Sequence, residues 1–227
     1  MNSAILVAAG RGTRMGPEVD KLFLEISGRP VVAHAWQRFN DAACIQEIIL
    51  VVRDGLQPHF AELARQYSFA KPHRLVIGGA ERQDSVWNGL AALSPESEMV
   101  AIQDAARPCT SEALIAATLA AARESGAAVA AQPVTDTLKE SADGRTVTRT
   151  VDRSKLWSVQ TPQCFQTAII RRAIQAAREQ GLNLTDDTAA CELIGQSVRL
   201  VPSRSPNPKV TVPGDLPLIA SLLQDRV

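Results

Sequence analysis

The first residues along the chain whose types could do chemistry lie in a glycine-rich loop near the N-terminus. Residues 8–21 read AAGRGTRMGPEVDK, and the glycines allow the backbone to turn sharply and to expose N–H groups to an anion. Arg11, Arg14 and Lys21 add positive charge to the same short stretch. Because cations that converge on such a loop suit a triphosphate, we predict phosphate binding here. The alternative is a plain connection between a strand and a helix.

The loop differs from the two commonest phosphate-binding motifs. No Gly-Lys-Ser/Thr sequence closes it, as a Walker motif would require. Met15 stands where a dinucleotide-binding loop has its third glycine. The prediction therefore depends on the basic residues more than on the glycine spacing.

A second segment, IGGAERQDSV at residues 77–86, joins a glycine pair to polar side chains at an expected helix start. The glycines permit close approach to the backbone. Arg82 and Ser85 lie where a helix N-terminus favours oxygen ligands. The spacing fits equally well if Asp84 or Ser85 only caps the helix.

The third segment, IQDAARPC at residues 102–109, is a strand that leads directly into Asp104. An aspartate at the carboxyl end of a central strand is a common place to hold Mg²⁺, which takes one or two carboxylates together with substrate phosphates. Arg107 follows three residues later. The alternative is a structural salt bridge between these two residues.

Other polar residues are weaker indicators of a functional site. Some lie in a polar stretch or after a proline-rich loop, where charged side chains are usually solvated: Thr137, Lys139, Arg149, Asp152, Arg153 and Lys209. The three histidines show no common pattern, and we interpret them as surface or helix residues: His34, His59 and His73.

Strands and helices that alternate along the chain must position these segments. Short apolar runs predict strands at residues 3–8, 47–52, 74–77, 99–103, 127–134 and 198–202. Helical patterns cover residues 30–39, a stretch ending near 67, the residues after the glycine pair, 112–124, 167–180, 186–195 and the C-terminal end. Pro30 is predicted to open the first helix, and Ser111 to cap the helix at 112–124.

This alternation predicts an α/β fold with a doubly wound, mainly parallel sheet and helices on both faces. Ligands bind such sheets beyond the carboxyl ends of the strands, where all three segments lie. Residues 135–155 interrupt the alternation with polar, Thr- and Val-rich sequence around Asp143-Gly144, a hairpin turn signal. We interpret them as a β-arm that projects from a single domain spanning residues 1–227.

The composition excludes several classes of protein. Lys+Arg and Asp+Glu each total 24, and this balance argues against a nucleic-acid-coating protein or a membrane-surface binder. The apolar run at the N-terminus is short, has no basic region before it and fits a buried strand, not a signal peptide. The four cysteines lack metal-binding spacing, so we expect reduced, mostly buried thiols in a cytoplasmic protein.

Taken together, the segments resemble a known family. LVAAGRGTRM followed by Lys21 is similar to the nucleotidyltransferase superfamily. GGAERQDSV, DAARP, the arm's DTLK and TVDR, TPQ at 161–163 and KVT at 209–211 resemble, in that order, the 2-C-methyl-D-erythritol 4-phosphate cytidylyltransferases of the non-mevalonate isoprenoid pathway. The similarity covers nearly the whole chain. The sequence departs from the family pattern at Asp20, Gln103 and Ala80.

The resemblance implies a Rossmann-like nucleotidyltransferase fold and a role for each matching residue. It implies that CTP is bound by Ala8, Ala9, Gly10, Gly12, Gly79, Arg82 and Ser85. It implies a reacting centre formed by Arg14, Lys21 and Asp104, with Mg²⁺ at Asp104. It implies contacts to the methylerythritol phosphate from Arg107, Thr161 and Lys209, and from Thr137 and Arg153 of a neighbouring subunit, because the family's arm crosses a homodimer interface.

The implied reaction is attack by a phosphate monoester oxygen on the α-phosphorus of CTP, with release of pyrophosphate. A phosphate dianion is already a nucleophile, so positioning and charge neutralisation suffice. The alternatives are a ribitol-5-phosphate cytidylyltransferase and a catalytically inactive nucleotide sensor.

Overall fold

The computed structural model describes residues 1–10 and 20–224. The strands are β1 (Asn2–Ala8), β2 (Glu25–Ile26), β3 (Arg29–Pro30), β4 (Glu47–Val52), β5 (His73–Ile77), β6 (Met99–Asp104), β7 (Ala127–Pro133), β8 (Leu138–Glu140), β9 (Arg149–Val151), β10 (Trp157–Gln166) and β11 (Arg199–Pro202). The helices are α1 (Val31–Asp41), α2 (Gln57–Gln66), α3 (Arg82–Ala91), α4 (Glu112–Ser125), α5 (Thr167–Glu179), α6 (Asp187–Leu193) and α7 (Asp215–Gln224).

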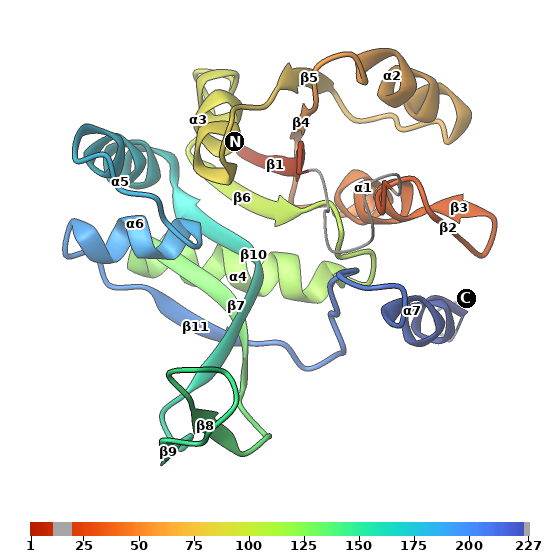
Figure 1. Ribbon diagram of the computed structural model, residues 1–227. Helices are drawn as coiled ribbons and strands as arrows, with labels where there is room; N and C mark the ends of the chain where they lie inside the picture. The colour runs from red at the N-terminus through yellow and green to blue at the C-terminus, as the bar shows by residue number, and fades with distance from the viewer. Residues whose placement is uncertain (11–19, 225–227) are drawn as a thin grey trace.

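Within these described ranges, seven strands form the central sheet, in the order β11-β7-β10-β6-β1-β4-β5. Neighbouring strands are parallel except at β10, which runs antiparallel to both β7 and β6. The predicted mainly parallel α/β sheet is therefore confirmed (Figure 1). The sequence did not predict β10, which lies in the middle of the sheet.

Helices cover both faces of this sheet, and each face has its own apolar layer. Helices α1, α2, α4 and α7 pack around Trp36 and Phe60 on one face. Helices α3, α5 and α6 pack around Phe165 and Ile174 on the other. Strand β4 has all six residues buried, as expected for a central strand that is covered on both sides.

The starts of two helices test local predictions. The predicted cap of α4 is confirmed, because the Ser111 hydroxyl accepts the Leu114 N–H at 3.2 Å. Pro30 lies one residue earlier than predicted: it ends β3 and occupies the N-cap of α1, and Val31 is the first helical residue. The cap position takes an extended conformation, which the fixed φ of proline allows.

The segment 135–155 forms a hairpin that projects from the body, as predicted (Figure 1). Strands β8 and β9 pair antiparallel, and the Val134 N–H donates to the Leu156 carbonyl, so the hairpin continues the β7 and β10 pair. The turn is longer than the signal suggested and spans 141–148. Asp143 organises it by accepting the N–H groups of Arg145 and Thr146 at 2.8 and 2.7 Å.

The cysteines agree with the expectation from their spacing. All four lie in the described ranges as free thiols: three are buried, and Cys44 is half-buried. Among the residues that the structure describes, no helix has the length and apolar character needed to cross a membrane.

Candidate active site

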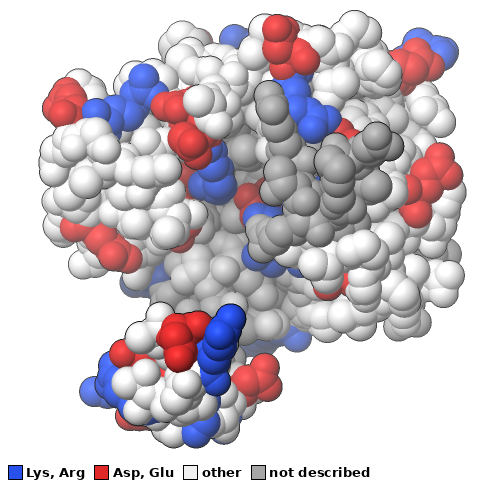
Figure 2. Space-filling model, in the orientation of Figure 1, with Lys and Arg blue, Asp and Glu red and all other residues white. Residues whose placement is uncertain are grey.

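A cavity of about 780 Å³ opens at the carboxyl ends of four adjacent strands, β6, β1, β4 and β5. The residues directly after each strand line it, as expected for a sheet of this kind. Of the residues singled out in the sequence, the structure places eight on its wall: Ala9, Gly10, Lys21, Gly79, Arg82, Ser85, Asp104 and Lys209. Figure 2 shows basic and acidic side chains meeting in a hollow in the middle of this face.

The glycine pair after β5 allows tight packing on this wall. A Cβ atom on Gly78 would lie 2.8 Å from the Ser85 hydroxyl and closer still to the Cβ of Ala9. The Gly79 N–H donates to that same hydroxyl at 3.1 Å, and the hydroxyl donates to the Glu81 carbonyl at 3.2 Å. Ser85 therefore ties the glycine turn to the start of α3.

Of the two caps that the sequence offered for α3, Asp84 takes part, together with Glu81. Glu81 is the N-cap residue, and its side chain accepts from the backbone of Asp84, the third helical residue. The Asp84 carboxylate accepts the Glu81 N–H in return. This capping box leaves Ser85 outside the cap, on the wall of the cavity.

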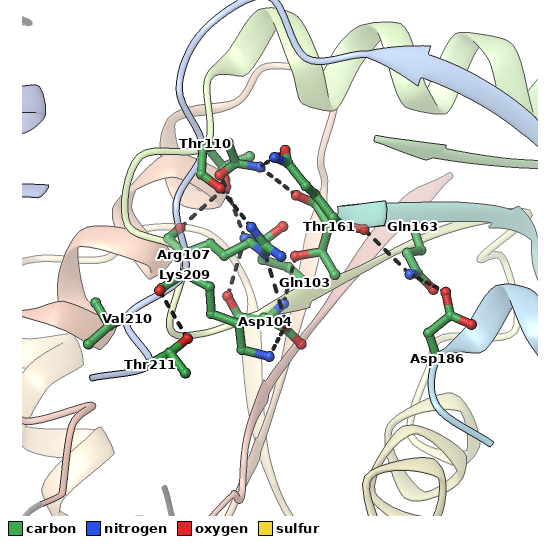
Figure 3. Close-up of polar contacts among 12 residues, drawn as sticks. Gln103, Asp104, Arg107, Thr110, Thr161, Gln163, Asp186, Lys209, Val210 and Thr211 are labelled. Atoms are coloured by element: carbon green, nitrogen blue, oxygen red, sulfur yellow. Dashed lines mark hydrogen bonds and ion pairs between the residues drawn. The ribbon is translucent and has the colours of Figure 1, made fainter. Parts of the chain in front are cut away.

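Asp104, the last residue of β6, is surrounded by cations. Its carboxylate lies 2.6 Å from the Lys209 ammonium, 3.5 Å from Arg82 Nε and 4.0 Å from Arg107 Nε. Figure 3 shows Lys209 and Arg107 approaching it from different segments. Burial alone would raise the pKa of Asp104, but the attraction of Lys209 and Arg82 outweighs it and lowers the pKa to about 2. Asp104 is therefore an ionised carboxylate at neutral pH.

The contacts of Asp104 extend beyond the Arg107 salt bridge that the sequence offered as an alternative. The Arg107 contact exists, but it is the longest of the three. The closest cation is Lys209, 105 residues away in the chain, so the local salt bridge with Arg107 is part of a wider charged cluster. Lys209 itself, expected to be solvated when considered alone, has a side chain that is only 34% exposed.

Lys21 reaches the cavity from the end of the glycine-rich loop. Its ammonium donates to the Val210 carbonyl at 3.0 Å, next to Lys209. This contact brings the first and last segments of the site together on one wall. The loop residues Arg11, Gly12, Arg14, Met15 and Gly16 lie outside the described residues.

Arg107 and Thr161 lie behind Asp104 and do not line the cavity in the part of the chain that the structure describes. The Thr161 hydroxyl accepts the Asp104 N–H at 3.1 Å, and Arg107 donates to the Asn207 carbonyl at 2.6 Å. Asn207 in turn donates to the Thr161 carbonyl at 2.8 Å. In this chain, these residues fix the backbone that carries Asp104. Ala8 is the buried end of β1.

The arm residues lie elsewhere. Thr137 and Arg153 are exposed on the hairpin, and among the described residues they do not line the cavity of their own chain. The Arg153 guanidinium donates to the Thr135 carbonyl within the arm. Figure 2 shows the arm standing out below the hollow.

The three positions that depart from the resembled family are in or beside the site. Asp20 pairs with Arg53, which also lines the cavity. Gln103 is fully buried and donates to the Thr110 hydroxyl at 2.9 Å. Ala80 is exposed on the cavity wall.

The sequence analysis missed several polar residues that support the site. Asp187 binds Arg82 through both carboxylate oxygens, Gln163 joins β10 to α6, and Asn207 is almost fully buried beside Thr161. An aspartate pair in front of a predicted helix at 186–195 was the available signal for Asp187, but it also fits a simple helix cap.

Replacing Asp104 by Asn is expected to lower turnover about 100-fold and the unfolding temperature by only about 2–6 °C. The carboxylate balances three cations at the cavity, so its loss disturbs the charge that faces a phosphate ligand. The fold should lose little, because Arg82 retains Asp187 and Arg107 retains the Asn207 carbonyl. Steady-state rates and thermal unfolding measure the two effects.

Asp41→Asn, the same substitution at an exposed residue at the end of α1, is the matched control and should leave both quantities unchanged. A large loss of stability together with full activity in Asp104→Asn would mean that the cluster is only structural.

Known proteins resemble this chain in sequence and in structure. Residues 3–225 match the family model described as 2-C-methyl-D-erythritol 4-phosphate cytidylyltransferase. A protein of that name from Alkaliphilus oremlandii is 40% identical over 99% of this chain and 95% of its own length. A protein of the same name from Desulforamulus reducens is 42% identical over 98% of this chain and 96% of its own length.

Solved structures resemble the chain over its whole length. The crystal structure of 4-diphosphocytidyl-2C-methyl-D-erythritol synthase from Anaerococcus prevotii has a TM-score of 0.86 and 31% identity, and the match covers 98% of this chain and 96% of that one. The 2-C-methyl-D-erythritol 4-phosphate cytidylyltransferase of Thermus thermophilus has a TM-score of 0.82 and 35% identity, over 99% and 100% of the two chains.

Proposed function

Because the chain belongs to the 2-C-methyl-D-erythritol 4-phosphate cytidylyltransferase family, we propose that the cavity beyond β1, β4, β5 and β6 is its active site. The chain is a nucleotidyltransferase that transfers the cytidylyl group of CTP to 2-C-methyl-D-erythritol 4-phosphate. The products are 4-diphosphocytidyl-2-C-methyl-D-erythritol and pyrophosphate.

The charged cluster at Asp104 is the observation that carries this assignment of the site. Three cations converge on one ionised carboxylate at the carboxyl end of a central strand, and Lys21 lies on the same cavity wall. Two substrates rich in phosphate need such a surplus of positive charge. We assign the base and ribose of CTP to the adjacent wall, where the tightly packed glycine turn and Ser85 line the cavity.

In the proposed reaction, an oxygen of the methylerythritol phosphate forms a bond to the α-phosphorus of CTP. The bond from that phosphorus to the bridging oxygen breaks, and pyrophosphate leaves with the electron pair. Lys21, together with Arg14, offsets the negative charge that collects around the five-coordinate phosphorus. Lys209 approaches the acceptor phosphate, Arg107 supports Asp104 from behind the cavity wall, and no covalent intermediate is needed.

Asp104 fits the role of a Mg²⁺ ligand in this site. It is ionised, it reaches the cavity, and one carboxylate with substrate phosphates is a donor set that Mg²⁺ commonly uses. A bound Mg²⁺ would supply further positive charge to the triphosphate. Lys209 holds the same carboxylate in this chain, so nucleotide binding and the Lys209 contact are coupled.

Two further proposals concern the state of the protein. We propose a homodimer in which the arm of one subunit brings Thr137 and Arg153 to the site of the other, because neither residue lines the cavity of its own chain in the described structure. We propose a cytoplasmic location, since the four cysteines, all described, are free thiols of the kind that a reducing compartment preserves.

Pyrophosphate release tests the function directly. With 2-C-methyl-D-erythritol 4-phosphate as acceptor, CTP is expected to support turnover at least about 100-fold better than ATP, GTP or UTP, because nucleotide enzymes discriminate through buried polar contacts to the base. With CTP held constant, ribitol 5-phosphate should be a poor acceptor.

Preference for ribitol 5-phosphate would instead assign the rival cytidylyltransferase activity. Tight CTP binding without pyrophosphate release from any acceptor would indicate a nucleotide sensor.

A further inference from the structure

Arg82, which lines the cavity, is held by a carboxylate from a distant part of the chain. Its Nη1 and Nη2 atoms donate to the two oxygens of Asp187, each at 2.8 Å. Asp187 is the first residue of α6 and lies 105 positions further along the chain. Its side chain is 1% exposed, so this is a buried, two-pronged ion pair, the strongest geometry available to an arginine.

The same guanidinium also faces Asp104. Arg82 Nε lies 3.5 Å from an Asp104 oxygen, while the two outer nitrogens are engaged by Asp187. Burial alone would lower the pKa of Arg82, but the attraction of Asp187 and Asp104 outweighs it and raises that pKa above its ordinary value. Arg82 is therefore a permanent cation fixed between two carboxylates, with one edge toward the cavity.

Asp187 is itself fixed by strand β10. Its N–H donates to the Gln163 side-chain oxygen at 3.0 Å. The Gln163 amide nitrogen donates to Asp186 at 3.0 Å, and Asp186 caps α6 by accepting the Ala189 N–H (Figure 3). Two residues before Gln163, Thr161 accepts the Asp104 N–H. One strand thus sets the positions of both carboxylates that hold Arg82.

The ion pair has a consequence for the cavity. Without Asp187, the outer nitrogens of Arg82 would lose their partner, and Asp104 is the next carboxylate within reach. A two-pronged pair between Arg82 and Asp104 would occupy the oxygens that otherwise face Lys209 and the ligand. By binding both outer nitrogens, Asp187 prevents Arg82 from forming this two-pronged pair with Asp104.

We propose that Asp187 is a positioning residue for CTP binding, which acts by holding Arg82 in place and so keeps Asp104 available in the cavity. This inference rests on the proposed assignment of the cavity as the CTP site. Asp187 is too deeply buried to touch a ligand, and both of its carboxylate oxygens bind Arg82, so we expect the effect of its replacement on nucleotide binding to pass through Arg82.

The test compares Asp187→Asn, Arg82→Gln and the double variant by steady-state kinetics. Asp187→Asn keeps the size of the side chain and removes the charge. It is expected to raise KM for CTP about tenfold and to lower kcat/KM for CTP by about 10- to 100-fold. When Arg82 is already replaced by Gln, Asp187→Asn should cause no further loss of CTP binding, because Asp187 acts through the Arg82 guanidinium.

Asp186→Ala is the matched control, because it removes the neighbouring carboxylate and the cap of α6 but leaves the partner of Arg82 in place. It should lower the unfolding temperature while KM for CTP stays within about twofold, since a partly unfolded sample loses kcat and not KM. Calorimetric titration with CTP gives the nucleotide affinity of each protein without turnover. Wild-type turnover tests the proposed function separately.

Three results would overturn the inference. The first is an unchanged KM and CTP affinity in Asp187→Asn, whatever its stability. The second is an equal loss from Asp187→Asn when Arg82 is already replaced. The third is the same rise in KM in Asp186→Ala, which would assign the effect to the stability of α6.

Discussion

Replacing Lys21 by Met will lower kcat by about 10²- to 10³-fold and leave the protein folded. The ammonium reaches the cavity wall beside Lys209, and loss of one preorganised charge at a reacting phosphorus typically has an effect of this size. The side chain is half-buried and has a hydrogen bond to one backbone carbonyl, and Met fills a similar volume. Single-turnover rates with saturating CTP, together with thermal unfolding, measure the effect.

Lys71→Met is a closely matched control. Lys71 is half-buried like Lys21, and its ammonium also donates to backbone carbonyls, those of Phe39 and Ala42, but it lies outside the cavity lining. It should change stability by a similar amount and leave kcat unchanged. Turnover of Lys21→Met at the wild-type rate would remove Lys21 from the reacting centre.

Two inactive variants will restore activity when they are mixed, if each arm completes the site of the other subunit. Arg153→Ala and Lys21→Met are each expected to be inactive alone. In a mixed dimer, one site collects both defects and the other has neither. Random remixing gives half mixed dimers with one good site of two, so about a quarter of wild-type activity should return. The measurement is turnover after co-refolding of equal amounts, with size-exclusion chromatography to verify dimers.

Arg149→Ala is the control on the same hairpin, because Arg149 pairs with Glu140 inside the arm. This variant should be active alone. If verified mixed dimers of the first two variants stay inactive, Arg153 acts within its own chain and the shared site is wrong.

The sequence predicted the strands that position the site well, because these strands are short and mostly apolar. Strand β4 is an example: five consecutive apolar residues follow one glutamate, as expected for a strand that is covered on both faces. Asp104 and the glycine pair could be predicted as site residues for the same reason, since each directly follows such a strand. Their cavity is a consequence of parallel pairing.

The sequence could not predict β10 and the contacts that depend on it. Its sequence, WSVQTPQCFQ, contains a proline and several polar residues, which normally argue against a central strand. Gln160, Thr161 and Gln163 are buried because they bond to groups that lie far away in the chain. The Arg82–Asp187 pair is hidden for the same reason: nothing local distinguishes an aspartate that holds an arginine 105 residues away from one that caps a helix.

The position of β10 between β6 and β7 also sets the order in which neighbouring strands of the sheet become available during synthesis. Strands β1, β4, β5 and β6 are complete once residue 104 has left the ribosome, and they can pair with one another at once. β6 and β7 follow each other in sequence but cannot become neighbours, because the place between them belongs to a strand made later. The Thr161 acceptor for Asp104 and the Gln163 anchor for α6 are therefore added only after the residues of the arm have been made.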